Sequence, residues 1–430
     1  FRITVVGKPD LSNVMIIMIG MRNPRSDDQQ AKSFCIWVNE MHVQGFDNQS
    51  GTAAIARLDL KLADFATVQL AGKWTTFGFG GVQQKLADRS RDNSKEFSIS
   101  SAIALDKLLP EKWGFRIPLY VNYDLRDVKP NFNPYDPDTP LATSLSNYPE
   151  NDPRREQLEN ASTEKAERKG FNFSNVRKTK TNPSAKRNLW DFENFAFTYA
   201  FNEQTRRNSM IADYTQRQYK AGIIYQYGFP QRSWAPFGTV KSLERPYLEL
   251  LKDFNLSLLP TQIAVRFDAD RNFVKTQYRS ADLTSEGQAP LFEKYFLFNR
   301  AYDLSWNLTK SVVLTYSAFA NAVVDEPNGD IDTRAKQDSI WRHLRNFGRT
   351  KNFDQKIRLT YRLPLDKIPL LDWMTADYSH NIGYQFQANS LGISDTSGIA
   401  YGNIIRNSLD RSIRGKVDFV KLYLVWNLLY

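Results

Sequence analysis

The segment from Phe195 to Tyr227 has the sequence FAFTYAFNEQTRRNSMIADYTQRQYKAGIIYQY, and its pattern decides the fold. Aromatic side chains occupy every second position from Phe195 to Phe201, a polar connection follows near 204–209, and a second alternating stripe starts at Tyr219. Alternation with a period of two is typical of a β-strand that is apolar on one face only. The segment therefore predicts a pair of amphipathic, antiparallel strands.

The same alternation recurs from about residue 52 to the end of the chain. The further stripes lie within 56–62, 68–74, 97–105, 117–125, 263–267, 302–308, 312–316, 357–363 and 378–386. From these stripes and their spacing we expect about 14 strands after residue 45. Residues 46–430 are thus predicted to be all-β and antiparallel.

Composition excludes one class of membrane protein. The chain has 430 residues, of which 41% are hydrophobic, and its mean hydropathy is −0.51. Its longest apolar run, Val14 to Ile19, is far shorter than the about 20 residues of a membrane helix. Membrane β-barrels remain compatible with these values, because each of their strands is apolar on one face only. The aromatic content of 13% suits the aromatic girdles of such a barrel as well as a soluble core.

The connections between the stripes favour a barrel. Short connections are expected near 63–64, 106–115, 204–209, Pro260, 309–310 and 366–372, and long ones near 76–94, 127–192, 229–246, 273–291, 325–352 and 389–410. Short and long connections alternate, as in membrane barrels, whose loops grow on one side only. We therefore predict an antiparallel transmembrane β-barrel over 46–430 with a large loop insertion at 127–192. A porin or nutrient transporter and a soluble, secreted β-sandwich binding protein remain as alternatives.

Residues 1–45 have a different pattern. The segment from Val14 to Met21 is apolar on both faces, and Cys35, Ile36 and Trp37 follow one another. Strands that are apolar on both faces are typical of a packed soluble sheet. We predict a separate soluble β segment, part of a sandwich or cap domain. Because the sequence starts at Phe1, we also expect it to be a piece of a longer chain.

Signals for catalysis, metals and cofactors are weak. His42, His343 and His380 are far apart in sequence, and the lone Cys35 cannot form an intrachain disulfide. We expect no enzymatic activity, no metal and no cofactor. The basic run from Arg177 to Arg187 belongs to a chain of net charge +10, but it favours anionic lipid-sugar head groups or a partner protein over nucleic acid.

Two sets of candidate functional residues follow. Polar strand residues opposite the apolar stripes are predicted to line a water-filled pore: Arg57, Asp59, Lys61, Gln69, Lys73, Asn122, Asp124, Gln218 and Arg358. In the expected loop 127–192, the predicted partner-contact residues are Phe171, Phe173, Arg177 and Lys178. The expected loop 325–352 is a second candidate for partner contact.

Specific motifs resemble a known family. The stretch from Leu363 to Trp373, LPLDKIPLLDW, is similar to a turn signature of the SprA (Sov) family. The residues that carry this likeness are Leu363, Pro364, Asp366, Lys367, Pro369, Asp372 and Trp373. Weaker similarities lie at 20–24, 36–41, 62–65, 109–112, 133–138, 170–178 and 325–327, in the order of the family. The resemblance covers the whole chain, and its motifs are specific only in combination.

The resemblance implies that the strands of this chain form an arc of a much larger barrel. Members of the family form the outer-membrane translocon of the type IX secretion system of Bacteroidota, which we take to be the single-chain barrel of about 36 strands. It implies export of folded cargo proteins that carry a C-terminal signal domain. The implied partners are a FadL-like barrel shuttle protein, a plug protein, periplasmic components of the secretion machine and outer-membrane lipids. The expected mechanism is passive conduction along a hydrated wall.

Overall fold

The fold is described here from a computed structural model of the chain. The structure describes residues 18–20, 30, 33, 35–39, 49–84, 88–182, 184, 187–238, 240, 248–280, 288–368, 371–389 and 402–423. Most of the segment 1–45 lies outside these residues, so its expected sandwich or cap domain stays a prediction.

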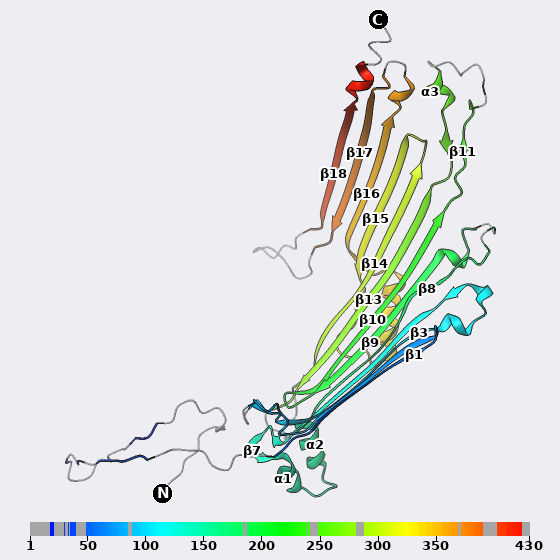
Figure 1. Cartoon of the computed structure of the whole chain (residues 1–430). Coiled ribbons are helices and arrows are strands. Elements are labelled where there is room, and N and C mark those ends of the chain that lie inside the picture. The colour runs from blue at the N-terminus through cyan, green and yellow to red at the C-terminus, as the bar shows by residue number, and fades with distance from the viewer. Residues whose placement is uncertain are drawn as a thin grey trace.

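The described chain forms one antiparallel sheet of 14 strands (Figure 1). In sheet order these are β1 (Ala53–Leu62), β2 (Ala66–Thr75), β3 (Asp92–Ala104), β5 (Pro118–Pro130), β8 (Glu164–Lys178), β9 (Phe195–Arg207), β10 (Ile211–Gly228), β13 (Gln262–Tyr278), β14 (Leu291–Asn307), β15 (Val312–Val323), β16 (Arg349–Leu363), β17 (Met374–Gln387) and β18 (Ile404–Val417), with the short β4 (Phe115–Arg116) paired to β8. Each long strand thus lies beside the next one in the sequence. The predicted all-β, antiparallel fold is confirmed.

The sheet has two chemically different faces. In an antiparallel pair, residues directly opposite each other project from the same face. The register pairs Leu58 with Leu70 and Phe201 with Tyr219, and it pairs Asp59 with Gln69 on the other side. We call these the apolar face and the polar face. The alternation in the sequence therefore becomes two continuous surfaces.

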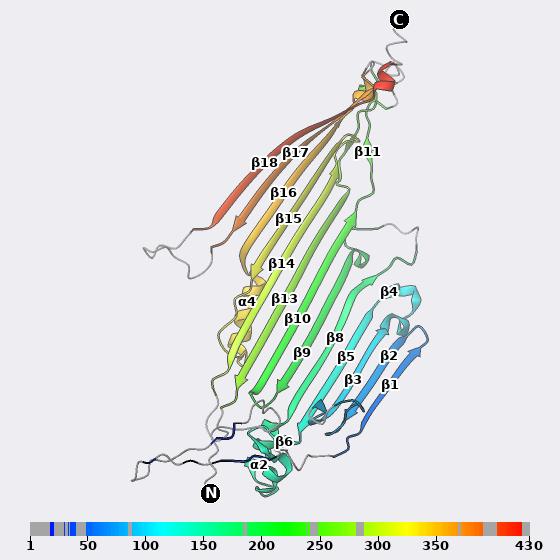
Figure 2. The ribbon, with the colours of Figure 1, turned by 60° about the vertical axis from the view of Figure 1, so that its left-hand side comes forward.

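Strand length and stagger distinguish this sheet from a compact sandwich. The strand β10 has 18 residues, and both β13 and β14 have 17, well above the usual 5 or 6. Figure 2 shows the strand ends stepping steadily along the sheet from β1 to β18. A steady shift of this kind is the shear that tilts the strands of a barrel. Within the described residues β1 pairs only with β2, and β18 only with β17, so closure into a barrel is not seen.

The connections gather at two ends of the sheet, because successive strands are antiparallel. The turn end carries 63–65, 105–117, 179–194, 229–261, 308–311 and 364–373, and the loop end carries 76–91, 131–163, 208–210, 279–290, 324–348 and 388–403. The predicted strict alternation of short and long connections is wrong at two places. A long connection, 229–261, lies at the turn end, and a short one, 208–210, lies at the loop end.

The predicted loop insertion at 127–192 is also wrong, because β8 runs through it and pairs with β5 and β9. The first half of β8 carries charges on both faces, so it lacks the apolar alternation that reveals a strand. Ion pairs across the strands take the place of apolar contacts: Lys169 lies 3.6 Å from Glu203, and Glu164 lies 3.9 Å from Arg126. The strand β18 was hidden in the same way, since it too is rich in polar residues.

A small subdomain, residues 131–163, lies at the loop end. It consists of β6 (Phe132–Asn133), β7 (Asp136–Pro140), α1 (Leu141–Ser146) and α2 (Pro153–Ser162), and Leu141, Leu145 and Leu158 form its core. The side chain of Asp152 accepts a hydrogen bond from the Arg154 amide, and Pro153 occupies the first turn of α2. Asp152 is therefore the N-cap of α2, and the proline lies where its missing N–H costs no hydrogen bond.

A second covering segment is the strap, residues 324–348, which contains α4 (Arg334–Arg345). It folds back onto the apolar face near the loop end, where Phe273, Phe296 and Ala320 are buried. At its C-terminal end Gly348 has a φ of +68°, and an added Cβ there would lie 2.8 Å from the Val323 carbonyl oxygen. Glycine therefore lets the chain turn back closely along β15.

At the turn end, connection 229–261 contains the β11 (Ser233–Trp234) and β12 (Leu256–Ser257) hairpin and the short α3 (Glu249–Lys252). The remaining turns are the 3₁₀ segments η3 (Leu105–Leu108), η4 (Glu111–Trp113), η5 (Phe192–Asn194) and η7 (Leu365–Lys367). Among the described helices, none has the length and apolar character needed to cross a membrane.

Candidate transport surface

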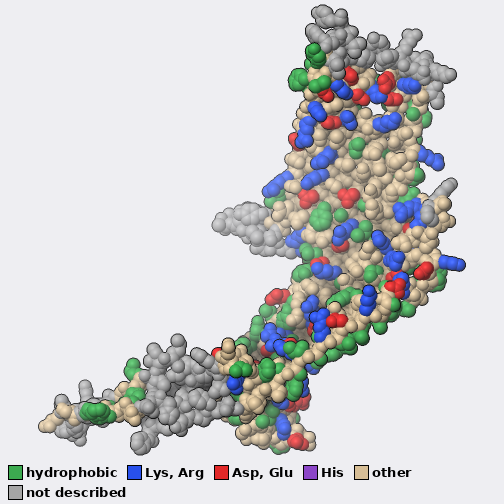
Figure 3. All heavy atoms as spheres, viewed as in Figure 1, with side chains coloured by type: hydrophobic (Ala, Val, Ile, Leu, Met, Phe, Trp, Pro, Cys, Tyr) green, Lys and Arg blue, Asp and Glu red, His purple; other side chains and the backbone are tan. Residues whose placement is uncertain are grey.

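The polar face brings together all nine residues predicted to line a pore. On β1, Arg57, Asp59 and Lys61 project from it, and Asp59 lies directly opposite Gln69 of β2. The others are Lys73, Asn122, Asp124, Gln218 and Arg358, on β2, β5, β10 and β16. Figure 3 shows Lys, Arg, Asp and Glu side chains dispersed over a broad face of the molecule, with few hydrophobic groups among them in its upper part.

A row of uncharged polar residues crosses the first half of this face. Following the register from strand to strand, it begins at the Arg57–Asp59 ion pair on β1 and runs through Gln69, Ser100, Asn122, Gly170, Asn202, Gln218 and Asn272. We call this the carboxamide row, because most of its members are Asn or Gln. A carboxamide both donates and accepts hydrogen bonds. The row therefore offers water a surface without net charge.

Gly170 is built into the centre of this row. A Cβ at this position would lie 2.3 Å from Asn202 Oδ1, 3.0 Å from Asn122 Oδ1 and 2.9 Å from the Phe201 carbonyl oxygen. The two asparagine side chains thus close over the glycine from both neighbouring strands. Only a residue without a side chain leaves them this space.

A second polar row crosses the other half of the sheet. It runs through Gln262, Ser305, Thr315, Arg358, Asn381 and Asp410. The Arg358 guanidinium donates to Asn381 Oδ1 at 2.8 Å, and the Asn381 amide donates to Asp410 Oδ2 at 3.2 Å. The two rows overlap on β13, where the stagger of the strands separates them. Together they extend from β1 to β18.

Charges on the polar face are largely neutralised by neighbours. The guanidinium of Arg57 lies 2.9 Å from the Asp59 carboxylate, and that of Arg126 lies within 4 Å of both Glu96 and Glu164. The Arg57 side chain is still 66% exposed. This surface is therefore strongly hydrated and of mixed sign, so it has no strong preference for anions or cations.

The signature turn contacts a connection that is distant in sequence. The Lys367 ammonium, on η7, lies 2.5 Å from Glu249 Oε1 and 2.9 Å from Asp253 Oδ2. The hydrogen bond from Lys367 lowers the pKa of Asp253, and the hydrogen bonds to the two carboxylates raise the pKa of Lys367. Pro369 lies outside the described residues, so its place in the turn stays a prediction. The turn and α3 together form an ionic cluster at the turn end.

The predicted partner-contact residues do not form a loop. Phe171 and Phe173 project from the apolar face of β8, where the Phe171 ring lies 5.8 Å from that of Phe201. Arg177 and Lys178 pair with the short strand β4 near the turn end. Their expected loop setting is wrong, because the ladder of β5, β8 and β9 incorporates the segment. Whether they contact a partner stays a prediction.

The polar face also contains residues that were not predicted from the sequence, notably Asn202, Asn272 and Asp410. For Asn202 the alternating pattern was sufficient, since this residue directly follows the aromatic stripe of the opposite face. Asp410 falls within the connection predicted at 389–410, because the first half of β18 has a weak apolar alternation.

The histidines and acidic residues of the described chain are not arranged as a metal site. The described residues contain no group of three or more His, Cys, Asp or Glu that could hold a metal. His343 Nδ1 lies 2.8 Å from the Asp325 carbonyl oxygen, and His380 Nδ1 lies 3.1 Å from the Tyr378 hydroxyl. His42 lies outside the described residues. Each described histidine therefore has a local structural partner.

The first part of the chain matches a known family. Residues 2–145 match the model of a family described as a motility related/secretion protein, SprA_N. The matched region includes β1, β2, β3 and β5, with the first part of the carboxamide row. No curated protein matches the chain.

Proposed function

Because the chain belongs to the SprA family of motility-related and secretion proteins, we propose that its sheet is part of the wall of a protein-conducting β-barrel in the outer membrane of a Gram-negative bacterium. In this proposal the apolar face contacts lipid and the polar face lines an aqueous lumen. The cargo is a folded protein with a C-terminal secretion signal, moved by type IX secretion.

The observation that supports this proposal is the separation of the two faces over the whole sheet. On the apolar face, Ile223, Ile382 and Leu409 are each at least 42% exposed. Exposed apolar surface of this extent is unfavourable in water and favourable against lipid. On the opposite face, both polar rows remain solvated. A soluble sandwich would instead bury its apolar face against a second sheet.

The mixed charge of the polar face favours a protein cargo over a small solute. A porin selects ions or nutrients with charged rings or constrictions of one sign. Here several charges lie in pairs of opposite sign, and uncharged carboxamides lie between them. Such a wall lets a folded protein keep its own hydration as it passes. No residue of the wall needs to make or break a bond.

Direction of transport is assigned to partners in this proposal. A FadL-like barrel shuttle protein and a plug protein would bind the mouths of the pore, and periplasmic components would supply energy. The structure offers three segments outside the sheet for such contacts: the subdomain 131–163, the strap and the connection 229–261. These three segments take the place of the expected loop 127–192 as candidate partner-contact surfaces.

The proposal can be tested by placing single cysteines on the two faces of the full-length protein in outer-membrane vesicles, with Cys35→Ser as the background. Asn202→Cys lies on the polar face and Phe197→Cys lies on the apolar face of the same strand. A water-soluble maleimide is expected to label only the polar-face cysteine. Equal labelling of both would contradict the membrane location and favour a soluble sandwich.

Passage of cargo through the lumen is tested by a second experiment, photo-cross-linking. A photo-reactive amino acid at Gln218, on the polar face, is expected to cross-link secreted proteins that carry the C-terminal signal, whereas one at Tyr199, on the apolar face, is not. Passage of small solutes without any cargo cross-link from Gln218 would favour the porin alternative.

A further inference from the structure

On the apolar face near the loop end, a row of aromatic side chains is followed directly by a row of charged side chains. Phe171, Phe201 and Tyr219 lie directly opposite one another on β8, β9 and β10, with ring centroids 5.8 and 5.0 Å apart. The next position toward the loop end is charged on each of these strands. We call these the aromatic row and the charged row.

The charged row consists of Lys169, Glu203 and Arg217. Glu203 lies 3.6 Å from the Lys169 ammonium and 3.5 Å from the Arg217 guanidinium, so one carboxylate bridges both cations. On the turn-end side, the apolar face of β10 is uncharged from Tyr219 to Tyr227, within the about 9–11 residues that cross hydrocarbon. An aromatic row followed by charges is the sequence of groups found where a barrel leaves the lipid.

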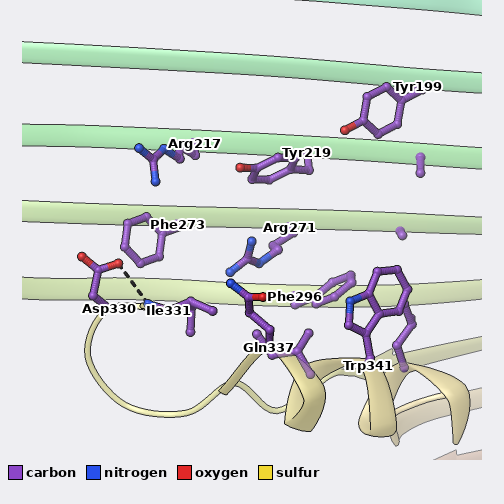
Figure 4. Close-up of a pocket in the computed structure, with 14 residues that line it drawn as sticks. Tyr199, Arg217, Tyr219, Arg271, Phe273, Phe296, Asp330, Ile331, Gln337 and Trp341 are labelled. Atoms are coloured by element: carbon purple, nitrogen blue, oxygen red, sulfur yellow. Dashed lines mark hydrogen bonds between the residues drawn. The ribbon is translucent and has the colours of Figure 1, made fainter. Parts of the chain in front are cut away.

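The helix α4 lies against this line. It covers a cavity of about 530 Å³ whose lining includes Tyr219, Arg217, Arg271 and Trp341. Figure 4 shows Trp341 and Gln337 reaching from α4 toward the strands that carry Tyr219 and Arg271. The strap is held there by the Arg271 to Glu326 ion pair and by hydrogen bonds from Lys294 to the Pro327 and Gly329 carbonyl oxygens.

The positive charges that line the cavity do not require a bound anion. Arg271 is paired with Glu326, and Arg217 with Glu203, so both arginines of the lining already have a carboxylate partner. The unbalanced charge lies instead on the outer side of the helix.

The helix combines an aromatic side chain with cations. Trp341 lines the edge of the cavity and is still 62% exposed, while Arg334, Arg342 and Arg345 are exposed on the outer side. None of the three arginines forms an ion pair within the described part of the chain. The single acidic side chain of α4 is Asp338. Arginines on the polar side of an amphipathic helix, with tryptophan on its apolar side, are typical of helices that lie in the head-group region of a membrane.

We propose that α4 is an in-plane anchor at the lipid surface, in which Trp341 lies at the level of the head groups and Arg342 and Arg345 bind the phosphates of anionic lipids. The inference rests on the proposed membrane location. As an anchor, α4 is a lipid-binding element that fixes the depth of the sheet in the membrane. Charge complementarity and continuity with the apolar face identify the occupant as lipid.

The test uses the full-length protein in nanodiscs of phosphatidylcholine alone or with added phosphatidylglycerol, and it measures amide hydrogen exchange of residues 334–345. With phosphatidylglycerol, exchange is expected to slow by about fivefold for each arginine that contacts a phosphate. The double variant Arg342→Gln/Arg345→Gln should abolish this difference. Asp338→Asn, which removes the opposing charge from the same helix, should increase it.

Lys112→Gln, in the exposed η4 turn at the opposite end of the sheet, is the matched control and should leave the exchange of α4 unchanged. Protection of β13 and β14 reports that each variant keeps its fold. Equal exchange of α4 in both lipid compositions would overturn the anchor, while incorporation into the discs would still support the membrane location. Failure of the wild-type protein to enter discs would instead refute the proposed function.

Discussion

At the scale of single residues, the polar face depends on positions where a side chain would be too large. Gly170 sits between Asn122 and Asn202, whose amide groups occupy the space that a Cβ would need. Glycine in a strand interior is otherwise unfavourable, because it loses more conformational entropy on folding than other residues. Its presence here is therefore explained by the close approach of the two asparagines.

Gly170→Ala is expected to destabilise the sheet by about 1–3 kcal/mol, because the new methyl group displaces both asparagines and meets the Phe201 carbonyl oxygen. Unfolding by denaturant in detergent micelles measures the change. Gly72→Ala is the control, since nothing lies within 4 Å of an added Cβ there. If the two variants had equal stability, the close packing around Gly170 would carry no energetic weight.

At the scale of elements, the signature turn and α3 are joined by charge. Lys367 contacts both Glu249 and Asp253, although more than 100 residues separate them in sequence. All three side chains are partly exposed, so solvent screening limits the contribution of the cluster to about 1 kcal/mol or less. Its role is to hold the turn in position more than to stabilise the fold.

The pH dependence of this cluster follows from the two pKa shifts. The lowered pKa of Asp253 means that its contribution is present above the ordinary carboxyl pKa and is lost as the pH falls through the lowered value. The raised pKa of Lys367 means that its contribution is lost only as the pH rises above the ordinary lysine range. Amide exchange of 363–368, corrected for intrinsic rates, is expected to stay slow at neutral pH and to accelerate below about pH 4.

Lys367→Met should remove the acid transition and accelerate exchange of the turn at neutral pH, because both carboxylates lose their partner. Lys112→Met, at another turn of the same end, should not. An acid transition that persists in Lys367→Met would assign it to a different group.

At the scale of the whole molecule, integrity depends on the uninterrupted order of strands. The strand β8 pairs with β5 on one side and β9 on the other, and few buried side chains support the sheet apart from the covered regions. In the proposed membrane location, removing a strand would leave two unpaired edges in lipid, where unsatisfied backbone groups cost several kcal/mol each. Removing a covering subdomain leaves every strand paired.

Deletion of 150–185 is therefore expected to abolish insertion into the outer membrane, because it removes β8 together with α2. Replacement of 131–163 by a short glycine- and serine-rich turn should preserve insertion, since the β5–β8 ladder already meets at Val128 and Glu164. Heat-modifiable migration on gels and resistance to urea extraction measure insertion. Stable insertion of the 150–185 deletion would show that β8 is dispensable.

The sequence by itself determined the strands, their antiparallel order and the division into two faces, because period-two alternation is a local property that needs no knowledge of neighbours. All nine predicted pore residues share one face for this reason. Tertiary structure alone decided the rest. It revealed β8 and β18, whose cross-strand partners compensate for weak apolar patterns, and it placed the long connection 229–261 at the turn end. It also brought α4 onto the aromatic row and Lys367 onto α3, because contacts between distant segments depend on the register and stagger of the sheet.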